Sequence, residues 1–170
     1  MNFLEQLAAE WYQYKGYFVI TNLRFGRNVS GRGGYIGEID VIAYEPKSRE
    51  VIHLEASTDA LSWSKRKKIF EKKFTDARKY YIKIFPFKEV EMKPRQIALV
   101  GFNLSPKTTS WKSAPPKNSR SESIKIEVIH IPMFFQNINA ELKDKDPQKD
   151  AIPETHPLLR TIQYAMFYMK

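Results

Sequence analysis

Two acidic residues occupy two adjacent strand-like segments on either side of a short polar turn. Asp40 lies in the segment 37–44 and Glu55 in the segment 51–57, and both segments are rich in apolar and β-branched residues. The stretch between them contains Pro46 and otherwise only polar or charged side chains, which is typical of a turn. The two segments therefore predict an antiparallel hairpin that carries both acids.

The register of this hairpin decides which side chains share a face. A turn centred between Lys47 and Ser48 places Asp40 opposite Glu55. Because side chains alternate along a strand, one face then carries Glu38, Asp40, His53, Glu55 and Ser57, and the other carries Ile39, Val41, Ala43, Ile52, Leu54 and Ala56. Directly opposed carboxylates repel one another. We therefore expect a cation between Asp40 and Glu55.

Hydrophobic periodicity and breaker residues predict the remaining elements. We expect a helix over 2–15, a strand over 17–25, a basic glycine-rich loop over 26–34, a helix from Ser62 or Ser64 to about Phe85, a strand over 96–102, a Ser- and Pro-rich loop over 105–123, a strand over 124–131, and helices over 133–142 and 157–169. The apolar face of the long central helix should contain Phe70, Phe74, Ala77, Tyr81 and Ile84.

The order of these elements is helix, three strands, helix, strand, followed by a further strand and helices. A buried strand that follows a helix after an antiparallel meander indicates an α/β sandwich with a central mixed sheet. With 170 residues we expect a single domain, with a core over about 2–131 and a helical C-terminal addition over about 133–170.

The charge of the chain suggests an anionic partner. There are 28 Lys and Arg residues against 19 Asp and Glu, a net charge of +9, so nucleic acid is the first candidate and acidic lipid the second. A basic protein that is merely soluble has the same composition. The absence of Cys excludes disulfides and thiolate metal sites. With no apolar run near ~20 residues and no signal-peptide pattern, we expect no membrane span and a cytoplasmic protein.

The two acids have the chemistry of a magnesium site. Mg²⁺ prefers oxygen ligands and is usually bound by one or two carboxylates together with water and substrate phosphate. Asp40 and Glu55 supply two carboxylates, and the backbone carbonyl of Ala56 is a candidate third ligand. The alternative is that Glu38, Asp40 and Glu55 lie on a solvated face and pair with Lys or Arg.

The segments Gly37–Ala43 and Val51–Ser57, read as Gly-Glu-Ile-Asp-Val-Ile-Ala and Val-Ile-His-Leu-Glu-Ala-Ser, resemble the PD-(D/E)xK nuclease superfamily, which has the restriction-endonuclease-like fold. The resemblance extends from Asn2 to about Phe102 and includes the element order. It implies a DNA endonuclease of restriction, repair or junction-resolving type that depends on Mg²⁺ or Mn²⁺. Dimers are frequent in this superfamily, so a homodimer is a partner that the resemblance allows.

The resemblance also implies roles for individual residues. Asp40 and Glu55 match the metal-binding acids of the two motifs. Some members add a glutamate from the first helix, which makes Glu5 a further candidate ligand. The alternative for Glu5 is a first-turn residue stabilised by the helix dipole. Glu38, on the face expected to carry both acids, is a further catalytic candidate.

The chain departs from the superfamily pattern at Ser57, which stands where Glu-x-Lys is expected. Some members carry the lysine on the following helix instead. On a helical wheel Lys73 lies at the edge of the apolar face, so we expect it to be the catalytic substitute, with Arg66 and Lys67 as reserves. His53 is either a base, a ligand or a hydrogen-bonded structural residue.

Basic side chains that could contact DNA phosphates fall in three places. They are Arg27 and Arg32 in the glycine-rich loop, Lys65, Arg66, Lys67, Lys68 and Lys72 at the start of the long helix, and Lys112 in the Ser- and Pro-rich loop. Trp111 beside Lys112 could stack on a base or pack against the protein. Two other functions stay open: a nuclease-like protein without activity that binds nucleic acid, and a basic structural subunit.

Overall fold

The computed structural model describes residues 2–27, 34–59, 61–85, 93–101, 109–112, 123 and 125–169. The helices are α1 (Phe3–Tyr14), α2 (Trp63–Arg78), α3 (Tyr81–Ile84), α4 (Ile131–Leu142) and α5 (Pro157–Tyr168). The strands are β1 (Phe18–Arg27), β2 (Tyr35–Glu45), β3 (Glu50–Ser57), β4 (Lys93–Val100), β5 (Ser110–Lys112) and β6 (Lys125–His130).

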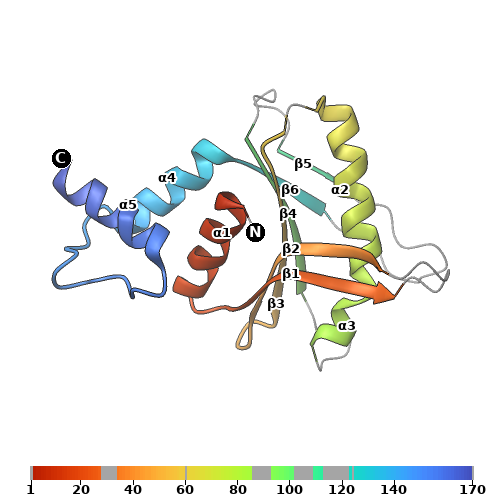
Figure 1. The fold of residues 1–170 in the computed structure, drawn as a ribbon, viewed down its shortest axis with the longest axis horizontal. Coiled ribbons are helices and arrows are strands. Elements are labelled where there is room, and N and C mark those ends of the chain that lie inside the picture. Colours follow the sequence, from red (N-terminus) through yellow and green to blue (C-terminus); the bar gives the residue numbers. More distant parts are fainter. Residues whose placement is uncertain are drawn as a thin grey trace.

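The strands form one mixed sheet in the order β1-β2-β3-β4-β6-β5. The first three strands make an antiparallel meander, β3, β4 and β6 are parallel neighbours, and β5 pairs antiparallel with β6. Helix α1 covers one face of the sheet and α2 covers the other, as Figure 1 shows. The predicted α/β sandwich with a central mixed sheet is therefore confirmed.

Hydrophobic clusters of the described residues cover both faces of the sheet, one on the α1 side and two on the α2 side. On the α1 side, Leu7 and Ala8 pack against Val41, Leu54 and Leu99 of three different strands, and all five side chains are fully buried. On the α2 side the buried residues include four of the five predicted for the apolar face of the central helix, Phe70, Phe74, Ala77 and Tyr81. The fifth, Ile84, is only partly buried. The alternation of β2 and β3 between the two faces of the sheet determines which of their polar side chains point toward α2.

The long helix expected from Ser62 to Phe85 is wrong as a single element. Helix α2 ends at Arg78, and the short α3 begins at Tyr81. The backbone N–H of Tyr80 donates to the carbonyl of Ala77 at 2.8 Å, a tight turn of 3₁₀ type that ends the α-helical ladder. No Gly or Pro marks this break in the sequence, so periodicity alone could not locate it.

The loop expected over 105–123 contains a strand that the sequence did not reveal. Ser110–Lys112 forms β5, whose three residues pair with Lys125–Glu127 of β6. The ring of Trp111 lies 5.4 Å from that of Trp63 and 6.4 Å from that of Phe70, so Trp111 packs against α2. Three residues are too few for a period-2 pattern. Of the rest of this loop, the structure describes only Thr109 and Ser123.

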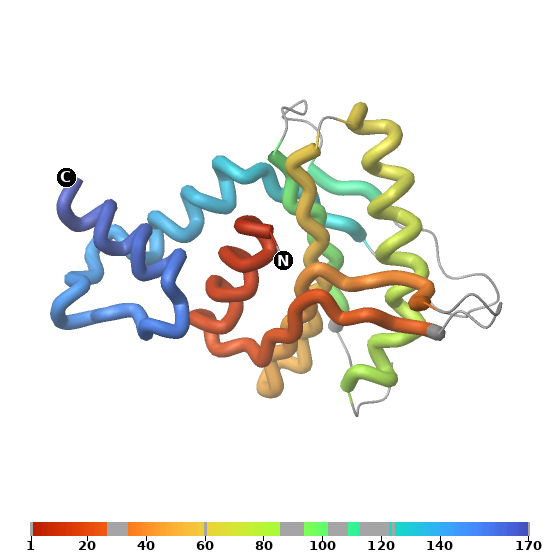
Figure 2. Tube along the Cα trace, viewed as in Figure 1, coloured from red at the N-terminus to blue at the C-terminus, as the bar shows by residue number. Residues whose placement is uncertain are grey.

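The C-terminal helices α4 and α5 lie beside α1, on the side away from α2 (Figure 2). Glu10 of α1 ties them in place: its Oε2 accepts the backbone N–H groups of Leu158 and Leu159 at 2.8 and 3.0 Å. These N–H groups belong to the first turn of α5, where no helical partner exists. The side chain of Gln6 also donates to Glu10, at 3.0 Å. Among the described helices, none is long and apolar enough to cross a bilayer.

Replacing Glu10 with Ala should lower the free energy of unfolding by about 1–3 kcal/mol, because it leaves buried donors of α5 without an acceptor. Urea denaturation of the full chain measures this change. Glu141→Ala is the matched control, since Glu141 is partly exposed and pairs with Lys15 and Lys145 at the surface. A loss for Glu10→Ala no larger than for Glu141→Ala would show that Glu10 does not anchor α5.

Candidate functional site

Asp40 lies at a distortion of the meander. Asn22 of β1 lies between the partners of Val41 and Ile39, the two neighbours of Asp40, and has a left-handed backbone with a φ of 51°. Beyond this point Ile39 packs with Ile42 on the α2 side, although Val41 packs on the α1 side. The prediction that Ile39 shares a face with Val41 is therefore wrong, because strict alternation is interrupted next to Asp40.

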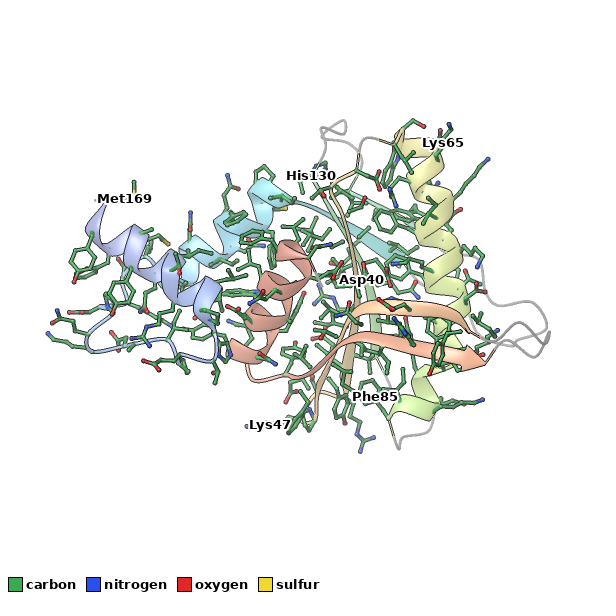
Figure 3. The ribbon with its side chains drawn as sticks, viewed as in Figure 1. Asp40, Lys47, Lys65, Phe85, His130 and Met169 are labelled. Carbon is green, nitrogen blue, oxygen red and sulfur yellow. The ribbon has the colours of Figure 1, made fainter. Side chains whose placement is uncertain are left out.

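The register of the acidic hairpin is as predicted from its turn. Ile42 pairs with His53. Two residues farther from the turn, the side chain of Asp40 takes part in the hydrogen bonds between β2 and β3. Its Oδ2 accepts the backbone N–H of Ala56 at 3.0 Å, and the backbone N–H of Asp40 lies 3.4 Å from Oε1 of Glu55. The two carboxylates are thus held side by side by backbone contacts between β2 and β3. Figure 3 labels Asp40 near the middle of the sheet.

Lys73 of α2 reaches both acids. Its Nζ donates to Oδ1 of Asp40 at 2.8 Å and also contacts Oε2 of Glu55. The side chain of Glu55 is fully buried, that of Asp40 is 11% exposed, and that of Lys73 is 34% exposed. A cation from the following helix therefore lies where the sequence predicted one, and it connects the buried acids with the protein surface.

Burial and mutual charge act in opposite directions in this triad. Burial raises the pKa of Asp40, the charge of Glu55 raises it further, and Lys73 lowers it. Burial also raises the pKa of Glu55, again against the effect of Lys73. Burial lowers the pKa of Lys73, but the charges of Glu55 and Asp40 outweigh this effect and the pKa is raised. The site therefore favours a cation strongly and tolerates two uncompensated carboxylates poorly.

His53 supports Glu55 from inside the protein. Its Nε2 lies 2.6 Å from Oε1 of Glu55 and its Nδ1 lies 2.6 Å from Oη of Tyr81. The side chain is fully buried, and burial lowers the pKa of His53 to about 3. The imidazole is therefore neutral, and its contact with Glu55 is a hydrogen bond. Of the three roles considered for His53, the hydrogen-bonded structural one fits this geometry.

Two other acidic candidates lie away from the triad. Glu38 is partly exposed and forms an ion pair with Arg24 of β1 at 3.1 Å. Glu5 forms a capping box with Asn2, in which each residue accepts a backbone N–H of the other. In the part of the chain that the structure describes, no three His, Cys, Asp or Glu side chains are placed to hold a metal. Glu38 and Glu5 are thus not brought to Asp40 and Glu55.

Ser57, which stands at the position of the missing motif lysine, is buried. The hydroxyl of Ser57 donates to Asp59 at 3.0 Å, and Asp59 is also in contact with the guanidinium of Arg66. Arg66 is mostly buried and lies over the ring of Phe70 at 5.8 Å. Arg66 is therefore committed to this contact chain and is a poor candidate for an open phosphate contact.

The remaining basic candidates differ in how open they are. Lys65, Lys68 and Lys72 are exposed on α2, and Lys112 is exposed at the end of β5. Lys72 pairs with Asp76 at 2.8 Å. Lys67, by contrast, lies over the ring of Trp111 at 5.8 Å. The side chain of Arg27, and Arg32 entirely, lie outside the described residues.

The triad offers oxygen ligands of the kind that Mg²⁺ prefers. The N–H of Ala56 points toward Asp40, and because the N–H and C=O of one strand residue point to the same side, its carbonyl lies on that side too. Asp40, Glu55 and this carbonyl would leave positions for water and a phosphate oxygen. The donor set therefore fits Mg²⁺ or Mn²⁺ when the ammonium of Lys73 moves from between the carboxylates.

Comparison with family models, with curated proteins and with solved structures gives no match. The resemblance to PD-(D/E)xK nucleases therefore rests on the motif residues and on the element order. Sequence reasoning missed two residues behind the site, Tyr81 as a polar partner and Gln96. Gln96 is the only polar side chain within the apolar run 96–100 of its strand, and that was the available signal.

Proposed function

We propose that this protein is a DNA endonuclease of PD-(D/E)xK type that hydrolyses phosphodiester bonds with Mg²⁺ or Mn²⁺. The observation that carries the proposal is the contact of one lysine from α2 with two adjacent acids on β2 and β3. Two acids and a lysine are the three groups of the superfamily's motif. Here the lysine is Lys73 on α2, and the motif's own lysine position is occupied by the uncharged Ser57. The basic surface of α2 is in keeping with an anionic substrate.

In this proposal Asp40, Glu55 and the carbonyl of Ala56 hold the metal ion. The bound ion would lower the pKa of a water molecule and neutralise charge on the phosphate. Lys73 contributes an ammonium that can donate to the attacking water or to a phosphate oxygen. Since burial disfavours charge on Asp40 and Glu55, loss of a proton from these acids and arrival of the ion are coupled, so metal affinity should rise with pH.

A plasmid-nicking assay with Mg²⁺ or Mn²⁺ tests this function. The wild type should nick supercoiled DNA, and Asp40→Asn and Glu55→Gln should reduce the rate by at least about 100-fold while DNA binding persists. Lys79→Met, which changes an exposed lysine at the end of the same helix, should retain the wild-type rate. Wild-type nicking by both acid variants would overturn the assignment of the site.

The same contact also favours a second function, in which Lys73 is a structural partner of the two acids. The ammonium of Lys73 already compensates both acids, one of which is fully buried, and Ser57 brings no charge to the motif. A nuclease-like protein that binds nucleic acid without cleaving it would have this arrangement as a purely structural ion pair. Under this alternative the wild type binds DNA, no metal supports nicking, and Ser57→Lys alone creates activity.

DNA binding should depend steeply on salt, because exposed lysines on α2 would contact phosphates. Removing one lysine–phosphate pair should reduce the slope of log K against log salt by about 0.9. The triple change of Lys65, Lys68 and Lys72 to Gln should therefore lower the slope by up to about 2.7. Lys143→Gln, in an exposed turn after α4, is the control and should keep the slope. An unchanged slope in the triple variant would place the DNA elsewhere.

A further inference from the structure

A chain of buried hydrogen bonds leads from the middle of the sheet to the inner oxygen of Glu55. The Nε2 atom of Gln96 lies 3.3 Å from Oη of Tyr81, which lies 2.6 Å from Nδ1 of His53. The Nε2 atom of His53 in turn lies 2.6 Å from Oε1 of Glu55. All four residues are buried, so water does not compete for these contacts.

Three separate elements bring these side chains together. His53 and Gln96 are register partners on the parallel strands β3 and β4, so they point to the same face of the sheet. Tyr81 enters from α3, directly after the break in the helix. Phe74 of α2 closes the space, with its ring 4.7 Å from the imidazole in an edge-to-face arrangement. The imidazole therefore has little freedom to turn.

The donors around Glu55 determine which group donates and which accepts at each step of this series of hydrogen bonds. Lys73 donates to its Oε2, while His53 and the backbone N–H of Asp40 approach its Oε1. An ionised carboxylate only accepts hydrogen bonds, so Nε2 of His53 carries the imidazole proton. Nδ1 is then an acceptor and receives the hydroxyl proton of Tyr81. The hydroxyl oxygen of Tyr81 is left to accept from the amide of Gln96.

We infer that His53, held by Tyr81 and Gln96, is the positioning residue of the candidate metal site. It binds Oε1 of Glu55 inside the protein and so leaves Oε2 directed toward Lys73. This inference rests on the proposed function for its effect on metal binding and cleavage. Groups of this kind, which orient a metal-binding carboxylate from behind, commonly change metal affinity or activity 10- to 100-fold when removed.

Tyr81→Phe tests the inference, because it removes one hydroxyl and keeps the packed ring. Mg²⁺ affinity, measured by calorimetry without DNA, should fall about 10- to 100-fold, with a similar fall in nicking rate at limiting metal. The ¹⁵N spectrum of the His53 ring should show the Nε2–H form in the wild type and a shifted Nδ1 signal in the variant. Tyr80→Phe is the matched control, since the ring of Tyr80 packs on Phe25 instead.

The outcomes separate this inference from the proposed function. A wild type that neither binds Mg²⁺ nor nicks DNA would overturn the proposed function, and the spectra would still decide the inference. A change in the Nδ1 signal and in the ¹³C signal of the Glu55 carboxylate in Tyr81→Phe alone would support it. An Nδ1–H form in the wild type, or equal signals and equal Mg²⁺ affinity in Tyr81→Phe and the wild type, would overturn it.

Discussion

Replacing Lys73 with Met should abolish most of the nicking activity and destabilise the protein in the absence of metal. The change removes the ammonium that contacts Asp40 and Glu55, and leaves a fully buried carboxylate beside a second one. Breaking a buried ion pair costs several kcal/mol, but Lys73 is one-third exposed, so we expect a loss of about 2–3 kcal/mol in the free energy of unfolding. The nicking rate should fall at least about 100-fold.

Divalent metal separates the two effects of this substitution. An ion that occupies the position of the ammonium should restore stability, by about 2.7 kcal/mol at 100 times its dissociation constant. Urea denaturation of Lys73→Met with and without Mg²⁺ measures this recovery, and Lys79→Met is the control, with changes within about 0.5 kcal/mol. Adding Ser57→Lys to Lys73→Met should recover part of the activity. Normal nicking by Lys73→Met would show that its charge has no catalytic role.

The second large effect is a loss of folding stability at acid pH that depends on His53. Burial lowers the pKa of His53 to about 3, against about 6.5 in the unfolded chain. Protonation therefore favours the unfolded state, so the stabilisation by neutral His53 is fully present above pH 6.5 and is lost as the pH falls toward 3. The full difference corresponds to up to about 5 kcal/mol. The wild type should lose this stability on acidification, whereas His53→Gln should not.

The comparison between wild type and variant isolates His53 from the neighbouring acids. Asp40 and Glu55 have raised pKa values, so their contribution is present at low pH and is lost as the pH rises through those values. Urea denaturation between pH 3 and pH 7 should show the wild type and His53→Gln converging in stability toward acid. His130→Gln, at the N-terminus of α4, should keep the acid-dependent loss of the wild type. Parallel curves for wild type and His53→Gln would contradict this linkage.

Local patterns in the sequence were sufficient for the acidic hairpin. The polar turn at Lys47 and Ser48 determined the register of its two strands, and this register placed Asp40 beside Glu55. The position of Lys73 at the edge of an apolar helical face likewise placed its ammonium on the side of the sheet that carries both acids. In each case the repeat of the strand or helix determines which way a side chain points, and the side chain points that way in the structure.

Predictions from the sequence were wrong or incomplete where contacts between distant parts of the chain determine the position of a side chain. Strict alternation put Ile39 on the wrong face, because the interruption next to Asp40 lies beside the left-handed Asn22 of a different strand. Only the structure showed that the first-turn Glu5 belongs to a capping box. Glu10, which resembles any other helical glutamate in the sequence, was not recognised as the anchor of α5. The sequence made Arg66 a candidate for a phosphate contact, whereas in the structure Arg66 pairs with Asp59.

The sequence by itself determined the order of the core elements from the first helix to the strand after the central helix, the two acids on one hairpin and the helix that supplies a lysine, because each depends on residues close along the chain. Only the tertiary structure decided that His53, Tyr81 and Gln96 stand behind Glu55. His53 and Gln96 meet through the register of the parallel strands β3 and β4, which are separated by the whole of α2. A parallel register is set by the packing of the crossover helix on the sheet, and no local pattern encodes it.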